Sequence, residues 1–163
     1  MSADMKAKLT SPKAILRIVE LIFSIITFAL VAEYSGYSKV DFTLFTGITT
    51  MILCLVFLGL YVARMDDSPT VSLFELIINV LFWVFWLSTA AAVSSIVSDI
   101  NGASFFGNWK GDADKFRASC AFAWLTFFLW TASTALSVMD TLKGRRGGGA
   151  APAAPAAPAV AMV

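Results

Sequence analysis

Four polar residues interrupt stretches of sequence that are otherwise strongly apolar: Arg17, Glu20, Glu75 and Asn79. Arg17 and Glu20 are three positions apart, and Glu75 and Asn79 are four apart, so each pair shares one face of a helix. An arginine beside two carboxylates can fix one helix against another, or it can gate an ion or a proton. The choice between these roles depends on the elements that carry the residues.

Those elements are four apolar runs of about 20 residues, at roughly 14–34, 42–64, 73–98 and 116–140. A helix needs about 20 apolar residues to cross a bilayer, and helices satisfy their own backbone amides in hydrocarbon. The short connections make adjacent helices antiparallel. The sequence predicts an all-α integral membrane four-helix antiparallel bundle. The first run is too long and too polar for a cleaved secretory signal, and we expect it to be helix one.

Composition supports this class and argues against others. Of 163 residues, 58% are hydrophobic and 14% are charged, which is far more apolar than a soluble domain. The net charge of +1 offers no basic surface for nucleic acid. Histidine is absent, and Cys54 and Cys120 both lie in apolar sequence, so we expect no disulfide, metal or cofactor, and no enzymatic activity.

The distribution of lysine and arginine predicts that both termini are cytoplasmic. This orientation places more of these residues inside than outside, and the inner set includes Lys143, Arg145 and Arg146. These three could contact anionic headgroups at about 1 kcal/mol each, although ordinary topogenic charge explains them equally well. We expect residues 1–13 to form a cytoplasmic segment, and the Gly/Ala/Pro-rich residues 142–163 to form a disordered cytoplasmic tail.

This orientation places the four intramembrane polar residues at similar depth. Arg17 lies about one helical turn from the inner interface and Glu20 about two turns. Arginine can extend to the headgroups, but a carboxylate left alone in hydrocarbon costs at least ~2.5 kcal/mol. The sequence therefore predicts a cluster of Arg17, Glu20 and Glu75 with Asn79 as a hydrogen-bonding neighbour. Two acids around one arginine also suggest that one acid carries a proton.

Such a cluster favours a structural role, because a slip of one turn would leave charges unpaired. An ion or proton path needs polar groups through the whole membrane depth. The outer halves of these helices offer only hydroxyl groups, such as those of Ser88, Thr89, Ser94 and Ser95.

Small residues at four-residue spacing predict a second packing device. The pairs are Ser88 with Ala92 in the third run and Thr131 with Ala135 in the fourth. Small side chains let helix backbones approach closely in a membrane. The pattern is compatible with contacts inside the bundle and with contacts between two protomers.

The segments "LRIVELIFSIITFALVAEY" and "ASCAFAWLTFFLWTASTALSVMD", with short loops between the runs, resemble the MARVEL-domain family of four-helix membrane proteins. The resemblance covers about residues 12–142, and it implies a MARVEL-like domain at 14–141. It also implies a protein of the plasma membrane, vesicles or endomembranes. Such a protein associates with itself and with sterol- or sphingolipid-rich patches during vesicle formation, sorting or membrane-domain assembly.

Three functions follow as hypotheses. The first is a non-enzymatic scaffold of membrane microdomains or transport vesicles, which acts as a homo-oligomer or with partner membrane proteins. The second is a channel or transporter component that uses the Arg17, Glu20 and Glu75 cluster as a gate or proton site. The third is an accessory subunit of a larger membrane complex that docks through its small-residue faces.

Overall fold

The computed structural model describes residues 9–63, 68–102 and 110–147, and the regular elements in this part of the chain are all helices. Four long helices are present, with one short 3₁₀ helix after the first. In chain order they are α2 (Pro12–Ala29), η1 (Ala32–Tyr34), α3 (Ser38–Val62), α4 (Pro69–Gly102) and α5 (Lys110–Gly147). The predicted all-α four-helix fold is confirmed.

Local sequence accounts for the start of α2 and for the turn before α3. The hydroxyl of Ser11 accepts a hydrogen bond from the amide of Ala14 at 3.3 Å, and Pro12 occupies the first helical turn, where its missing N–H costs nothing. Gly36 has φ +102°, a conformation that favours glycine. Its amide donates to the carboxylate of Asp41 at 2.8 Å, which ties the turn to the first turn of α3.

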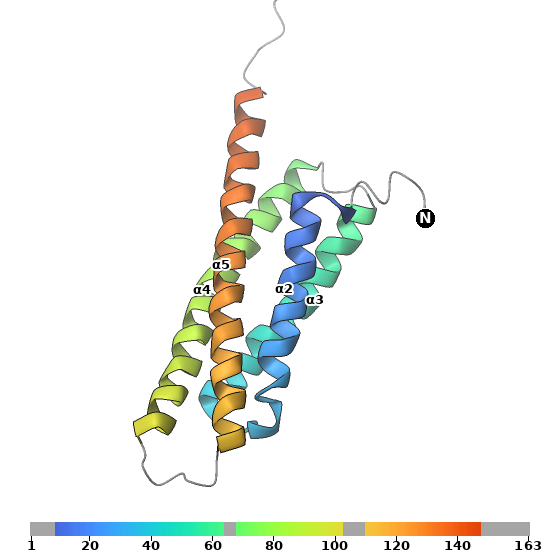
Figure 1. The fold of residues 1–163 in the computed structure, drawn as a ribbon. Coiled ribbons are helices and arrows are strands. Elements are labelled where there is room, and N and C mark those ends of the chain that lie inside the picture. The colour runs from blue at the N-terminus through green and yellow to red at the C-terminus, as the bar shows by residue number, and fades with distance from the viewer. Residues whose placement is uncertain (1–8, 64–67, 103–109, 148–163) are drawn as a thin grey trace, which may run out of the picture.

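The helices form a ring in which α2 packs on α3 and α5, and α4 also packs on α3 and α5. Helices α2 and α4 therefore sit diagonally across the bundle. Figure 1 shows the start of α2 and the end of α5 at the same end of the molecule. We call this the cluster end, because α2 carries Arg17 and Glu20 of the predicted polar cluster there. The opposite end, near η1, is called the η1 end. Helix α5 continues well past the other helices at the cluster end.

Aromatic and small side chains fill the interior along its length. The central core contains Phe82 and Trp86 of α4 with Ala123 and Trp130 of α5, and the rings of Phe82 and Trp130 stack 5.3 Å apart. Helices α2 and α3 approach each other closely at Gly47, where an added Cβ would lie 2.8 Å from Cβ of Phe28. Glycine at this position is what permits the close contact.

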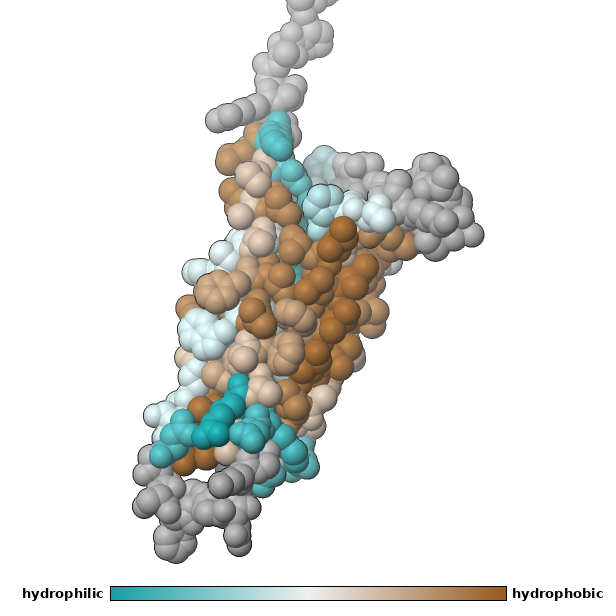
Figure 2. Space-filling view, in the orientation of Figure 1, coloured by the Kyte–Doolittle hydropathy of each residue, from teal (hydrophilic) through white to brown (hydrophobic). Residues whose placement is uncertain are grey.

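The face drawn in Figure 2 is a broad apolar band with hydrophilic residues toward both ends, including a group near the η1 end. Three helices, α3, α4 and α5, are long and apolar enough to cross a membrane. The described part of the chain thus has three candidate spans where the sequence analysis predicted four. Helix α2 is shorter, at 18 residues, and its sequence includes Lys13, Arg17 and Glu20.

The helices begin and end at different residues from the apolar runs. Helix α2 stops at Ala29, and the chain turns through η1 toward α3, whereas the first run extends to residue 34. Helices α4 and α5 continue through polar residues at both ends, because a helix does not require apolar side chains where it leaves the core. Residues 142–147, which sequence analysis assigned to the tail, belong to α5. Residues 1–8 and 148–163 lie outside the described part.

Candidate functional site

The structure brings Arg17, Glu20, Glu75 and Asn79 together in one buried ionic cluster. The guanidinium of Arg17 donates to Glu20 at 2.8 Å, to Glu75 at 3.0 Å and to the side-chain oxygen of Asn79 at 2.5 Å. All four side chains are buried, and Arg17 is 1% exposed. Charge-assisted hydrogen bonds of this kind are roughly twice as strong as neutral ones, and here they join the diagonal helices α2 and α4.

Helices α3 and α5 complete the cluster with partners that the sequence analysis missed. The hydroxyl of Tyr61 on α3 donates to Glu75 at 2.5 Å, and the hydroxyl of Ser133 on α5 donates to Glu20 at 2.6 Å. The amide nitrogen of Asn79 donates to the hydroxyl of Ser137 at 2.7 Å. All four long helices therefore contribute side chains to one hydrogen-bonded network.

A signal for the α5 partners is present in the sequence. Ser133 and Ser137 are four positions apart, as Thr131 and Ala135 are, but on a different face of the same segment. To predict which of the two faces points inward, one must know how α5 is rotated about its own axis. That rotation is set by packing against α2 and α4.

Two aromatic rings enclose the Arg17 guanidinium. Its central carbon lies 4.7 Å from the ring centroid of Phe57 and 4.9 Å from that of Trp130. Such cation–π contacts are worth about 2 kcal/mol or more when the cation is desolvated. The rings exclude lipid and water from the guanidinium while offering it a negative face.

Lys13 supplies a second cation at the rim of the cluster. Its ammonium lies 3.7 Å from Glu75 and 2.8 Å from Asp140, and its side chain is partly exposed. The sequence analysis counted two acids against one arginine and inferred a shared proton. Lys13 lies beside Glu75 but closer to Asp140, so three acids and two cations meet at this end of the bundle, and the shared proton stays a prediction.

The hydroxyl groups nearer the η1 end do not continue the cluster. Of the four that the sequence analysis singled out, only Thr89 is buried; Ser88 and Ser95 donate to backbone carbonyls of their own helix, and Ser94 contacts Cys120. Other buried hydroxyls, including that of Thr27, also donate to backbone within their helix. Among the described residues, the buried charged side chains are Arg17, Glu20 and Glu75.

The small-residue pairs face mainly outward. Ser88, Thr131 and Ala135 are exposed, and Ala92 is half-buried. The hydroxyl of Thr131 accepts a hydrogen bond from the indole of Trp83 at 2.9 Å on this outer surface. Thr131 therefore joins α5 to α4, whereas Ser88 and Ala135 are exposed on the outer surface.

The predicted headgroup contacts are described only in part. Lys143 is exposed on the extension of α5, as a headgroup contact requires. The backbone of Arg145 and Arg146 continues the helix, but their side chains lie outside the described part of the chain.

Comparison with models of known protein families identifies the family of this chain. The MARVEL model, which describes a membrane-associating domain, matches residues 8–136. The chain belongs to the MARVEL family. The matched MARVEL region contains α2, α3 and α4 and most of α5, and it includes Arg17, Glu20, Glu75, Asn79 and Ser133. No curated protein and no solved structure matches the chain. The predicted resemblance is confirmed, and with its apolar helices the chain is a membrane protein.

Proposed function

We propose that this MARVEL protein is a non-enzymatic organiser of membrane, which self-associates in microdomains or transport vesicles with both termini in the cytoplasm. The observation that carries the proposal is the buried cluster around Arg17, which reaches all four helices from one end of the bundle. A protein built to organise membrane needs a rigid outer surface, and hydrogen bonds that join all four helices contribute to one.

The cluster can act as a register lock. Breaking a buried ion pair by removing one partner costs about 3 to 5 kcal/mol. A slip of α2 by one helical turn would move Arg17 and Glu20 together by about 5.4 Å, which breaks the contacts of Arg17 with Glu75 and Asn79 and that of Glu20 with Ser133. Only one alignment of the helices is then stable.

The same cluster supports the predicted transmembrane position of α2, although its three charged residues keep this helix outside the candidate spans. Arg17 and Glu20 point inward, whereas the exposed residues of α2 between its two ends are all isoleucine: Ile15, Ile18, Ile22 and Ile25. The helix is about 27 Å long at ~1.5 Å per residue, close to the ~30 Å hydrocarbon thickness. We propose that α2 spans the membrane beside the three longer helices.

Self-association would use the outward small residues of α4 and α5. Ser88, Thr131 and Ala135 lie exposed on helices that otherwise present bulky apolar side chains to lipid. In a bilayer, such positions let helices of two molecules approach closely, where van der Waals contact replaces the hydrophobic effect as the driving force. Partner membrane proteins could use the same face.

Crosslinking in native membranes tests this proposal, followed by size analysis in mild detergent. We expect oligomers for the wild type and a shift to monomers for Ala135→Leu, because the larger side chain separates the helices. Val138→Leu is the matched control, since Val138 is an exposed, larger residue on the same helix. Oligomers of unchanged size in Ala135→Leu would contradict the assignment of this face.

A flux assay separates the scaffold from a channel or transporter component. Purified protein in liposomes is expected to give no pH-dependent ion flux. A flux that is lost in Glu20→Gln would replace the scaffold proposal with a gate or proton site at the cluster. A fixed heteromeric complex on native-size separation would instead identify an accessory subunit.

A further inference from the structure

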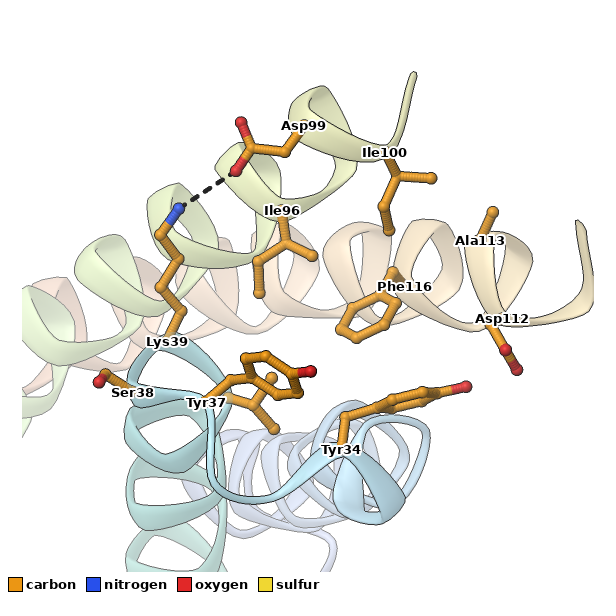
Figure 3. A pocket seen from close by; sticks show the side chains of 11 residues that line it. Tyr34, Tyr37, Ser38, Lys39, Ile96, Asp99, Ile100, Asp112, Ala113 and Phe116 are labelled. Carbon is orange, nitrogen blue, oxygen red and sulfur yellow. Dashed lines mark hydrogen bonds and ion pairs between the residues drawn. The ribbon is translucent and has the colours of Figure 1, made fainter. Parts of the chain in front are cut away.

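A cavity of about 530 Å³ opens at the η1 end of the bundle, far from the Arg17 cluster. It lies between η1, the first turn of α3, the end of α4 and the start of α5, as the close view in Figure 3 shows. Its volume is within the ~300–1,000 Å³ range of small-molecule sites. Neither the family relationship nor the proposed function assigns a ligand to it.

The cavity combines an apolar floor with a polar rim. Val40, Ile96 and Ile100 line its inner part and belong to the packed core at this end of the bundle. The apolar band in Figure 2 gives way to charged residues at the same end. An occupant at this level would contact hydrocarbon on one side and the headgroup region on the other, as a membrane lipid does.

Aromatic rings form one side of the cavity. Tyr34, Tyr37 and Phe116 contribute their rings, and those of Tyr34 and Phe116 lie 4.8 Å apart. Aromatic faces attract cations, and they suit quaternary ammonium groups, whose methyl groups also tolerate apolar surroundings. The ring of Tyr34 already has one cation near it, because the ammonium of Lys115 lies 5.8 Å from its centroid.

Charge at the cavity favours a cation over an anion. Asp99 and Asp112 line it, with Glu33 beside it, whereas the nearby cations are Lys39 and Lys115. Three acids against two lysines leave one negative charge in excess. Lys39 lies 3.4 Å from Asp99 at the rim, where its ammonium could also contact a phosphate.

We infer that this cavity binds the choline headgroup of a membrane phospholipid, with the trimethylammonium against the aromatic rings and Asp112, and the phosphate near Lys39. A primary ammonium fits the ring faces less well, because it is more strongly hydrated and has no methyl groups to lie against them. A phosphoglycerol headgroup lacks the cation that the excess negative charge favours. The inference is independent of self-association.

Lipid retention by the purified full-length protein tests the inference. The protein in dodecyl maltoside is mixed with equal amounts of short-chain phosphatidylcholine, phosphatidylethanolamine and phosphatidylglycerol, and bound lipid is identified by native mass spectrometry. We expect preferential retention of phosphatidylcholine and its displacement by soluble phosphocholine. A short-chain sphingomyelin, which has the same headgroup, should be retained equally well. Equal retention of all lipids, or no displacement, would overturn the inference.

Two variants connect retention to the cavity. Tyr34→Leu and Asp112→Asn should each weaken phosphatidylcholine retention by about fivefold, since each removes a contact worth about 1 kcal/mol. Phe45→Leu is the matched control, because Phe45 is an exposed aromatic residue on α3 outside the cavity. If Tyr34→Leu fails to fold, Asp112→Asn decides the question. Unchanged retention in Asp112→Asn would overturn the assignment.

Discussion

The guanidinium of Arg17 and the amide oxygen of Asn79 are 2.5 Å apart, although their helices α2 and α4 sit diagonally across the bundle. The contact therefore crosses the axis of the bundle rather than the interface between two neighbouring helices. Because Glu20, Glu75, Tyr61, Ser133 and Ser137 are bonded to the same group of atoms, a change at this point affects all four helices.

Arg17→Leu should strongly destabilise the bundle. The substitution leaves Glu20 and Glu75 buried without the arginine, and a loss of about 3 to 5 kcal/mol in the free energy of unfolding is expected. The measurement is denaturant unfolding in detergent micelles. Arg117→Leu is the control, because Arg117 pairs with Asp114 on the exposed surface and should contribute no more than about 1 kcal/mol. Equal effects of the two substitutions would contradict the proposal that the Arg17 cluster fixes the alignment of the helices.

Tyr61→Phe should lower the free energy of unfolding by about 1 to 3 kcal/mol. It removes the hydroxyl that donates to Glu75 at 2.5 Å and leaves a buried acceptor with one partner fewer. Tyr37→Phe removes the same atom from a side chain that is 71% exposed, and its effect should stay within about 0.5 kcal/mol. If both variants unfold like the wild type, the Tyr61 hydroxyl is dispensable.

Gly47→Ala should destabilise the α2–α3 contact by about 1 to 3 kcal/mol, because the new methyl group would lie 2.8 Å from Cβ of Phe28. Gly59→Ala is the matched control on the same helix. An added Cβ there has nothing within 4 Å, so the better helix propensity of alanine should stabilise by about 0.4 to 1 kcal/mol. Opposite signs in a thermal unfolding assay are the expected result.

The Glu33–Lys115 ion pair should make stability at the η1 end depend on pH. The hydrogen bond from Lys115 lowers the pKa of the Glu33 carboxyl below its ordinary value of 4.5. A lowered folded-state pKa means that the pair stabilises the fold fully above about pH 4.5. That contribution is lost as the pH falls through the folded-state pKa.

Comparison with Glu33→Gln isolates this effect, because every other titrating group is common to both proteins. The stability difference between wild type and variant should be constant from neutral pH down to about 5 and should vanish in more acidic solution. Thermal unfolding in detergent across this range is the measurement. A difference that persists unchanged in acid would mean that the carboxylate charge at Glu33 contributes nothing.

Sequence alone determined the helical class, the number of long helices and the presence of four polar residues within them. These follow from local physics: apolar runs of membrane length become helices because the backbone must satisfy itself, and spacings of three and four put Arg17 with Glu20 and Glu75 with Asn79 on shared faces. The family resemblance rested on the same segments.

Tertiary structure alone decided which side chains surround Arg17 and which small residues face outward. Phe57, Trp130 and Ser133 come from helices whose rotation about their own axes is set by packing, and no spacing within one helix encodes that rotation. The same freedom turned Thr131 and Ala135 toward the outside while Ser133 and Ser137 entered the cluster. Arg17 and Glu20 of α2 enter the cluster as the sequence predicted, and only the structure shows the isoleucine face that this helix presents outward.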